Sequence, residues 1–286
     1  MEFIGGQAVI EGVLMKSGSK VAIAVRTQEG KIISKKEKHK SITKKYKILN
    51  LPIIRGPIIL FETTVLGLKA LNYSANMALE EEKQEKLGTG TLILKVLVSI
   101  VFALALFKLL PLSLAQFTAN NYALFENRYL FNLLEGITKI SILVLYIYLI
   151  SLMPDVRRTF QYHGAEHKVV NAYEKNDLVN AKKYSRIHVR CGTSFILFVL
   201  ALSIVVYIFL PIDISFMTKY ALRIALLPLI AGIGYELIRI SPKCEKNIFF
   251  KIIMIPGLLL QRLTTREPSE EQLEVAKAAL YAVAQE

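Results

Sequence analysis

Long apolar stretches are the dominant pattern of this chain from residue 91 onward. A helix needs about twenty apolar residues to cross the hydrocarbon core of a bilayer. The stretch 195–210 contains no charged residue, which favours a spanning helix over a buried helix of a soluble protein. We therefore predict four spanning helices, at roughly residues 91–110, 136–153, 193–210 and 220–238.

The few charged residues in these stretches qualify the prediction only slightly. We expect Lys95, Lys108 and Lys139 each to lie near an end of a helix, where a long side chain reaches the interface. The last stretch contains Pro228 and two glycines, so we expect a kink there. On this interpretation the first three helices carry no paired charges at mid-depth.

Shorter patterns at the two ends of the chain predict cytoplasmic elements. Residues 7–37 alternate between apolar and polar positions and are interrupted by turn residues, as in a β meander. The tail beyond residue 268 predicts an amphipathic helix, because its apolar positions recur at helical spacing. These positions are Leu273, Ala276, Leu280 and Val283.

Two further apolar segments are too polar or too short to span a bilayer. Residues 52–76 are apolar but interrupted by Arg55, Glu62, Lys69 and Asn72, which indicates an interfacial or re-entrant helix. Residues 248–263 are broken by a Pro-Gly pair and are also expected at the membrane interface.

Together these patterns predict a mainly α, polytopic membrane protein with about four transmembrane helices, a small N-terminal cytoplasmic β unit and interfacial helices. Membrane and cytoplasmic segments alternate along the chain. The expected segments are the β meander with a basic connector (1–50), an interfacial or re-entrant helix with a charged linker (51–90), the first two transmembrane helices (91–153), a cytoplasmic loop (154–192), the last two transmembrane helices (193–240), and a cytoplasmic interfacial segment with the tail helix (241–286).

The distribution of Lys and Arg gives this topology an orientation. The chain is 53% hydrophobic, with mean hydropathy +0.42, and carries a net charge of +13. Lys and Arg number fifteen in residues 1–91, eight in 154–192 and seven after 238, against one each in 112–136 and 211–219. Because basic loops stay in the cytoplasm, we predict a multi-pass protein of the bacterial cytoplasmic membrane with both termini cytoplasmic.

The same distribution makes membrane lipids the expected partner. The charges follow the loops and form no basic motif with interleaved aromatic residues, so we expect no nucleic acid to bind. The first residues lack a basic segment and a continuous apolar core, so no cleavable signal peptide is expected. Both cysteines, Cys191 and Cys244, fall on the predicted cytoplasmic side and are interpreted as free thiols.

The loop between the second and third predicted spans holds three of the four histidines, His163, His167 and His188. On a helix, His163 and His167 project from one face, four residues apart, and can bind one metal ion. Glu166 completes an H-x-x-E-H motif. This is the order found in inverted zincins, in which the glutamate acts as the general base.

A third ligand is needed to complete the site, and either His188 or Cys191 is expected to supply it. Three protein ligands are typical of a catalytic zinc ion and four of a structural one. A divalent metal ion is therefore the predicted cofactor, with zinc preferred, although iron or manganese would accept a similar set. Proton sensing by the histidines, or a surface helix with two unrelated histidines, are the alternatives. Gly164 disfavours a regular helix, so we expect the helix to begin near it.

Other polar residues are candidates to surround the metal. Asn171 and Glu174 continue the helical face of the two histidines. Glu11 and Glu62 lie in apolar surroundings, where a buried carboxylate needs a partner such as the metal or an arginine. Glu236, at the cytoplasmic end of the fourth predicted span, is a further candidate, with an ion pair to the arginine three residues later as the alternative.

Several motifs together give the chain a family resemblance. They are GGQAVIEGVLM (5–15), RGP with Glu62 (55–62), ALNYSAN (70–76), HGAEHK (163–168), NAYE (171–174) and HVRCGTS (188–194). In these stretches, which run over most of its length, the chain resembles the YqhQ-like family of uncharacterised bacterial membrane proteins. The resemblance implies a location in the cytoplasmic membrane and dependence on a metal. It supplies neither a substrate nor a reaction.

The leading hypothesis is a metal-dependent membrane enzyme, a hydrolase with a site that faces the cytoplasm. His163 and His167 would hold the metal with His188 or Cys191, and Glu166 would be the catalytic base. The alternative is a non-enzymatic membrane scaffold or assembly factor with a structural metal site. A transporter ranks last, because the first three spans are expected to lack charges at mid-depth.

Overall fold

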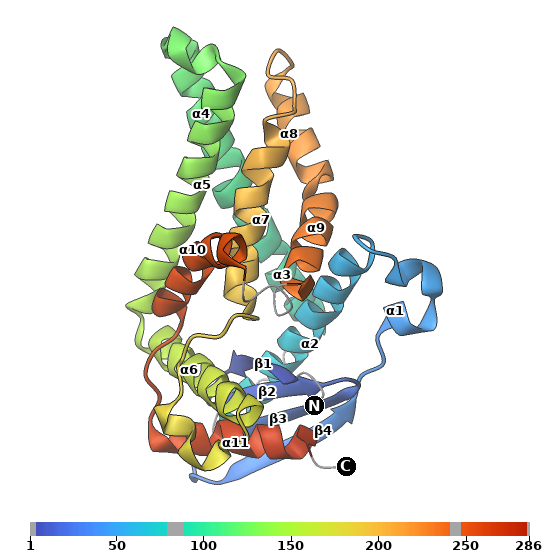
Figure 1. Ribbon diagram of the computed structural model, residues 1–286, viewed down its shortest axis with the longest axis vertical. Coiled ribbons are helices and arrows are strands. Elements are labelled where there is room, and N and C mark those ends of the chain that lie inside the picture. The colour runs from blue at the N-terminus through green and yellow to red at the C-terminus, as the bar shows by residue number, and fades with distance from the viewer. Residues whose placement is uncertain (1–3, 79–88, 241–246, 285–286) are drawn as a thin grey trace.

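The computed structural model describes residues 4–78, 89–240 and 247–284. Figure 1 shows a small sheet with helices on both of its faces and a bundle of long helices that rises from it. The charged linker around residues 80–86 and Cys244 lie outside the described residues.

The N-terminal sheet is an antiparallel meander, as the alternating pattern predicts. Its strand order is β1-β2-β3-β4, namely β1 (Ile4–Val9), β2 (Gly12–Ser17), β3 (Lys20–Arg26) and β4 (Ile32–Lys38). Two-residue turns join the first three strands. Glu11 and Gly18 lie in these turns with φ values of 51° and 55°, the left-handed conformation that such tight hairpins require.

Both faces of the sheet are covered, which explains why β3 is apolar at successive positions. The covering helices are α2 (Arg55–Ala78), α6 (Pro154–Glu174) and α11 (Glu270–Ala284). Val21, Ile23 and Val25 pack with α2 in one core cluster. Ala22 and Ala24 belong to a second cluster with α6 and α11. The amphipathic tail helix predicted from the sequence is therefore confirmed, and it packs its apolar side into this second core.

The bundle is built from the apolar middle and end of the chain. Its elements are α3 (Thr89–Leu104), a π-helical turn (Ala105–Leu109), α4 (Leu110–Asn121), α5 (Arg128–Ser151), α7 (Gly192–Tyr207), α8 (Phe216–Ala225), α9 (Leu227–Ile240) and α10 (Ile248–Thr264). Within the described ranges, three helical stretches are long and apolar enough to cross a membrane: Leu94–Asn121, Arg128–Ser151 and Phe216–Ile240. The predicted span 193–210 is represented by α7, which is apolar but shorter.

The first long stretch does not end near residue 110 as predicted but continues through Asn121. The π-helical turn joins α3 to α4. Pro111 then lies in the first turn of α4, where the missing N–H of a proline is tolerated. Residues expected in a loop are thus helical, and Leu112 and Ala115 pack against Phe131 of α5.

The prediction that lysines in the apolar stretches lie near helix ends is wrong for Lys108 and Lys139. Lys139 lies in the middle of α5 and is 1% exposed. Lys108 lies in the π-helical turn and is 6% exposed. Lys108 donates to the Tyr207 hydroxyl of α7, and Lys139 lies near Glu135 of its own helix and Ser203 of α7. Neither ammonium group therefore has to reach an interface. The expected absence of charges from the middle of these helices is therefore also wrong.

The two segments expected at a membrane interface are both helical. α2 packs against the sheet and against α9, and α10 packs against α7 and α5. Pro256 lies inside α10, and a Cβ atom at Gly257 would lie 2.9 Å from the side chain of Ser194, so glycine permits this close helix contact. Their position relative to a membrane stays a prediction.

Candidate metal centre

α6 carries the H-x-x-E-H motif and is helical throughout it. The prediction that the helix begins near Gly164 is wrong, because it begins at Pro154. A Cβ atom at position 164 would collide with the backbone oxygen of Arg266, whose N–H donates to the carbonyl of Phe160 at 2.9 Å. Glycine therefore allows the segment between α10 and α11 to lie directly on α6.

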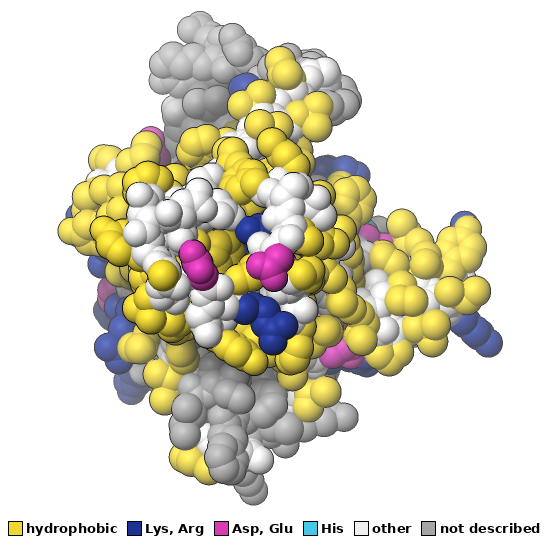
Figure 2. All heavy atoms as spheres, turned by 90° about the horizontal axis from the view of Figure 1, so that it is seen from above, with side chains coloured by type: hydrophobic (Ala, Val, Ile, Leu, Met, Phe, Trp, Pro, Cys, Tyr) yellow, Lys and Arg dark blue, Asp and Glu magenta, His cyan; other side chains and the backbone are white. Residues whose placement is uncertain are grey.

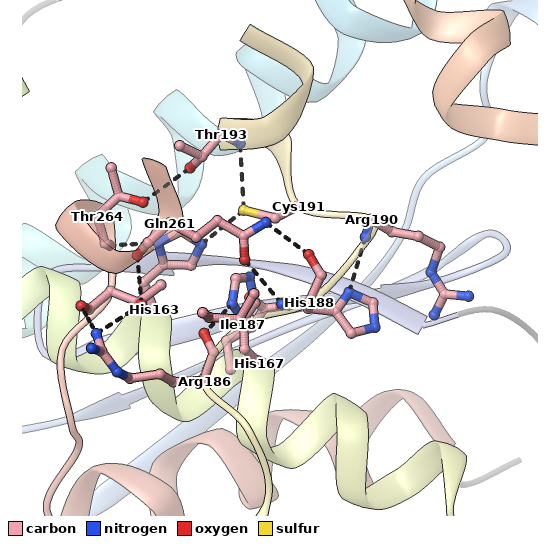
Figure 3. A network of polar contacts seen from close by, with 12 residues as sticks. His163, His167, Arg186, Ile187, His188, Arg190, Cys191, Thr193, Gln261 and Thr264 are labelled. Carbon is pink, nitrogen blue, oxygen red and sulfur yellow. Dashed lines mark hydrogen bonds and ion pairs between the residues drawn. The ribbon is translucent and has the colours of Figure 1, made fainter. Parts of the chain in front are cut away.

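His163 contacts two segments that are distant in the sequence. Its Nδ1 lies 2.8 Å from the backbone oxygen of Thr264 in α10, and its Nε2 lies 3.3 Å from Sγ of Cys191 (Figure 3). Because a carbonyl oxygen can only accept, Nδ1 carries the proton and donates it. In the neutral ring, Nε2 then keeps a free lone pair beside the sulfur.

His167 is arranged in the same way one turn later on α6. Its Nδ1 donates to the backbone oxygen of Arg186 at 2.7 Å, and the ring is 2% exposed. The ring centroids of His163 and His167 are 4.4 Å apart. The neutral ring again has its free lone pair on Nε2, so both histidines present the atom that a metal needs.

Cys191 supplies the third donor atom from the start of α7. Its Sγ accepts from the N–H of Thr193 at 3.4 Å, and a helix N-terminus favours negative charge. The donor atoms of His163, His167 and Cys191 all lie within 4.8 Å of one another. Tetrahedral ligands about 2.0–2.3 Å from a zinc ion are roughly 3.3–3.8 Å apart. Two imidazoles held by backbone carbonyls and one thiol therefore fit a divalent metal ion.

Glu166 lies beside this group and is buried. Its Oε2 is 3.4 Å from Nε2 of His167. A Cβ atom at Gly6 of β1 would lie 2.8 Å from Cγ of Glu166, so a glycine in the strand leaves room for this carboxylate. Glu166, His163, His167 and Cys191 all line one cavity of ≈690 Å³ between β1, α2, α6 and the start of α7.

His188 lies close to the group without belonging to it. Its ring centroid is 5.8 Å from that of His167. Its Nδ1 accepts the N–H of Arg190 at 3.3 Å, so the proton of the neutral ring is on Nε2. That atom lies 3.5 Å from Oε2 of Glu174. Of the two candidates for the third ligand, the geometry thus favours Cys191.

Glu174 and Asn171 support the segment that leads to Cys191. The adjacent His188 ring and the Arg190 guanidinium hold the pKa of Glu174 below its ordinary value. Asn171 donates from Nδ2 to the backbone oxygens of Ser185, at 2.8 Å, and Ile187, at 3.1 Å. These contacts position the carbonyl of Arg186 over His167, although neither residue contacts the three donor atoms.

The other three carboxylates suggested by the sequence bind partners outside the metal centre. Glu11 pairs with Arg158 and accepts from the Tyr162 hydroxyl at 3.2 Å. Glu62 accepts the Ile42 N–H at 2.6 Å. Glu236 accepts from Nε of Arg55 at 2.6 Å, whereas Nη1 of Arg239 is 3.9 Å away. The described structure brings none of these three carboxylates to His163, His167 or Cys191.

Sequence reasoning missed the residues that hold the imidazoles in place. Thr264 and Arg186 act through backbone oxygens, which leave no signature in a sequence. Gln261 was also missed: its amide accepts the His188 N–H at 2.9 Å and donates to the His188 carbonyl at 2.8 Å (Figure 3). The available signal was that Gln261 directly follows the uncharged, apolar run 252–260 of α10.

Comparisons with known proteins agree with the motifs. A family model described as a protein of unknown function (DUF1385) matches residues 51–286. The "Uncharacterized protein YqhQ" of Bacillus subtilis (strain 168) is 35% identical over 287 residues, which cover 95% of this chain and 89% of that protein. No solved structure matches the chain. The chain therefore belongs to the DUF1385 family, and its resemblance to YqhQ-like proteins is confirmed.

Proposed function

We propose that this protein is a metal-dependent enzyme of the bacterial cytoplasmic membrane, a hydrolase with a site that faces the cytoplasm. The observation that carries the proposal is the convergence of Nε2 of His163, Nε2 of His167 and Sγ of Cys191 at the wall of a large cavity. A buried carboxylate next to three candidate ligands is the arrangement expected of a hydrolytic metal site.

Each residue has a distinct role in this proposal. His163, His167 and Cys191 hold a divalent ion, with zinc as the first candidate, and the carbonyls of Thr264 and Arg186 orient the two rings. When bound, the ion supplies Lewis-acid activation of water and of the substrate. Glu166 accepts a proton from the attacking water, because its buried carboxylate lines the cavity close to His167.

The proposed orientation in the membrane rests on charge and on the position of the sheet. The segments rich in Lys and Arg include the sheet and α6, which pack together with α11 at one end of the bundle (Figure 1). Basic segments favour the cytoplasm. The cavity between the sheet, α2, α6 and the start of α7 would then take its substrate from the cytosol or from the inner leaflet. A peptide, an ester or a phosphoester all remain candidate substrates.

Metal content is the direct test. Inductively coupled plasma mass spectrometry on detergent-purified protein is expected to find about one divalent ion per wild-type chain, and much less in His167→Ala and Cys191→Ser. His39→Ala is the matched control, because His39 lies outside the group. After loading with Co²⁺, a thiolate-to-metal absorption band should be present in wild type and absent from Cys191→Ser. Folded wild type that holds no metal after purification without chelators would contradict the proposal.

Glu166→Gln separates metal binding from catalysis. The variant keeps all three donor atoms, so its metal content is expected to equal that of wild type. Loss of the base is expected to lower turnover about 10²–10⁴-fold on any substrate found by screening peptides, esters and phosphoesters. Equal turnover by both proteins would remove Glu166 from the mechanism.

A structural metal site in a membrane scaffold is the second candidate. It is favoured by the way the group joins three separate segments: α6, residues 186–191 and the end of α10. A structural ion predicts that chelation exposes α11 to protease, since folding then depends on the metal. A catalytic ion predicts that the chelated protein keeps its protease resistance and regains full metal content on reloading.

A further inference from the structure

A second polar cluster lies inside the helix bundle, separate from the histidines. Among the residues that the structure describes, four basic side chains are buried there together with one carboxylate, Glu135 of α5. The bases are Lys108, Lys139, Lys219 and Arg223. They come from the π-helical turn, α5 and α8, so the packing of distant segments creates the cluster.

Glu135 is shared between two of the bases. Arg223 donates to it from Nε at 2.8 Å and from Nη2 at 2.6 Å, and also donates from Nη2 to Oδ1 of Asn132 at 3.1 Å. Lys139 approaches the same carboxylate at 3.3 Å. The charge of Glu135 is therefore already engaged by Arg223 and Lys139, and it offers little to further cations.

Tyr207 of α7 lies at the centre of the cluster. Nζ of Lys108, Nζ of Lys139 and Cζ of Arg223 lie 5.2, 4.8 and 5.0 Å from its ring centroid. The Tyr207 hydroxyl accepts from Lys108 at 2.8 Å and donates to the backbone oxygen of Arg223 at 3.1 Å. Three cations thus meet around one neutral ring, whose face attracts positive charge only weakly.

The charges in this cluster do not balance. The hydrogen-bond partner of Lys108 is a hydroxyl, and that of Lys219 is the side-chain oxygen of Gln116 at 2.7 Å. The exposed Asp213 also attracts Lys219. If it is counted with Glu135, the described residues of the cluster comprise four bases and two acids. Uncompensated buried charges are strongly unfavourable, so the cluster keeps all four positive charges only if a further anion binds there.

Two of the bases lie on α8, at the end of the bundle that is away from the sheet (Figure 1). Lys219 and Arg223 are four residues apart on α8 and therefore lie on one face of that helix. Figure 2 looks onto this end and shows basic and acidic side chains gathered in the middle of a largely hydrophobic surface. Arg223 and Lys219 are both buried beneath this surface.

We propose that this cluster binds one phosphate-type oxyanion, between Lys108 and Lys139 and beside Arg223. An ammonium group has three N–H donors, and among the described residues Lys108 uses one of them, on Tyr207. The net excess of about two positive charges matches a phosphate group, which carries about −1.5 to −2 as a monoester near neutral pH. The anion is either free phosphate or the phosphodiester headgroup of an anionic phospholipid; both offer phosphate oxygens as acceptors, but the phosphodiester carries a single negative charge and offsets only part of the excess.

The test compares ligands at constant ionic strength on the full-length protein. Thermal unfolding in zwitterionic detergent is measured with chloride or with inorganic phosphate, and again in nanodiscs of phosphatidylcholine with or without phosphatidylglycerol. A rise in Tm with phosphate over chloride identifies free phosphate as a ligand. A rise with phosphatidylglycerol alone, and a phosphatidylglycerol molecule retained in native mass spectrometry, identify a headgroup. A Tm that rises with neither phosphate nor phosphatidylglycerol would overturn the proposal. This comparison uses the wild-type protein alone.

Variants then locate the site. Lys108→Met is expected to weaken the affinity for the effective ligand at least tenfold and, without that ligand, to have a Tm equal to or above that of wild type, because one excess charge is gone. Lys108→Arg keeps the charge and is expected to keep the binding. Lys95→Met, at an exposed position of α3, is the matched control with wild-type affinity. Equal affinity in wild type and in a folded Lys108→Met protein would refute the assignment.

Discussion

At the scale of single residues, the ligand atoms are determined by hydrogen bonds to the backbone. The motif indicates that His163 and His167 share a face, but the free lone pair on each Nε2 depends on a carbonyl beyond the motif. Arg190 does the opposite for His188, since its N–H occupies Nδ1 of that ring. Of the three histidines of the predicted cytoplasmic loop, two thereby become candidate ligands and the third lies beside them.

Gly164→Ala tests the close contact between α6 and residue 266. Alanine favours a helix by about 1 kcal/mol over glycine, but here its Cβ would press on the Arg266 carbonyl. The collision is expected to dominate and to lower stability by about 1–3 kcal/mol, and to weaken metal binding because Thr264 lies in the displaced segment. Thermal unfolding and metal content measure both effects. Gly192→Ala, where a Cβ meets open space, is the control, and an equal effect in both variants would refute this explanation.

Glu62→Gln tests the pH dependence at the junction of α2 and the basic connector. Burial raises the pKa of Glu62, but hydrogen bonds from Ser41 and the Ile42 N–H and attraction to His39 outweigh it, so the pKa lies below its ordinary value. A carboxyl group with a lowered folded pKa stabilises the fold at neutral pH, and this stabilisation is lost as the pH falls through that pKa.

The variant is therefore expected to be about 1 kcal/mol less stable than wild type at pH 7, and the difference should shrink as the pH falls below about 4. Thermal unfolding of both proteins over this range measures it. The control is Glu126→Gln, at an exposed position. A stability difference that grows on acidification would contradict the sign of the argument.

At the scale of elements, the tail helix ties the sheet to the histidine-bearing helix. Leu280 of α11 is fully buried in the core shared with α6, whereas the adjacent Tyr281 is 46% exposed. Leu280→Ala is expected to cost about 2–5 kcal/mol through lost burial and a cavity, and Tyr281→Ala less than about 0.5 kcal/mol. Protease sensitivity and thermal unfolding compare the two variants. Similar losses at both positions would mean that α11 does not pack as described.

Helices and strands were predicted well where a local pattern defines them, and poorly where contacts with distant segments determine their ends or their buried residues. The meander and the tail helix follow from periods of two and 3.6 residues. The extension of the first long helix to Asn121 could not be predicted, because a proline such as Pro111 usually ends a helix. It is tolerated here because it lies in the first turn of α4. The position of Lys139 was also predicted wrongly, because partners on α5 and α7 were not visible in the sequence. Inside the bundle its ammonium group donates to Glu135 and Ser203.

At the scale of the whole molecule, the proposed membrane topology can be tested by labelling one cysteine at each end of the protein. Asp213 lies at the end of the bundle away from the sheet, and Glu274 lies on α11 beside the sheet. A membrane-impermeant maleimide applied to intact cells is expected to label Asp213→Cys, and to label Glu274→Cys only after permeabilisation. Wild type, with its native cysteines, is the control. The reverse pattern would invert the topology, and labelling of both without permeabilisation would argue against a spanning bundle.

The sequence by itself determined the family, the apolar stretches that become the bundle, the meander, the tail helix and the motif with His163, Glu166 and His167. These features depend on spacing along one segment, which a sequence displays directly. The tertiary structure decided that Cys191 joins the two histidines while His188 lies aside, and that buried bases gather around Tyr207. Both outcomes depend on backbone oxygens and side chains from segments far apart in the chain, and no local pattern records which of these will meet.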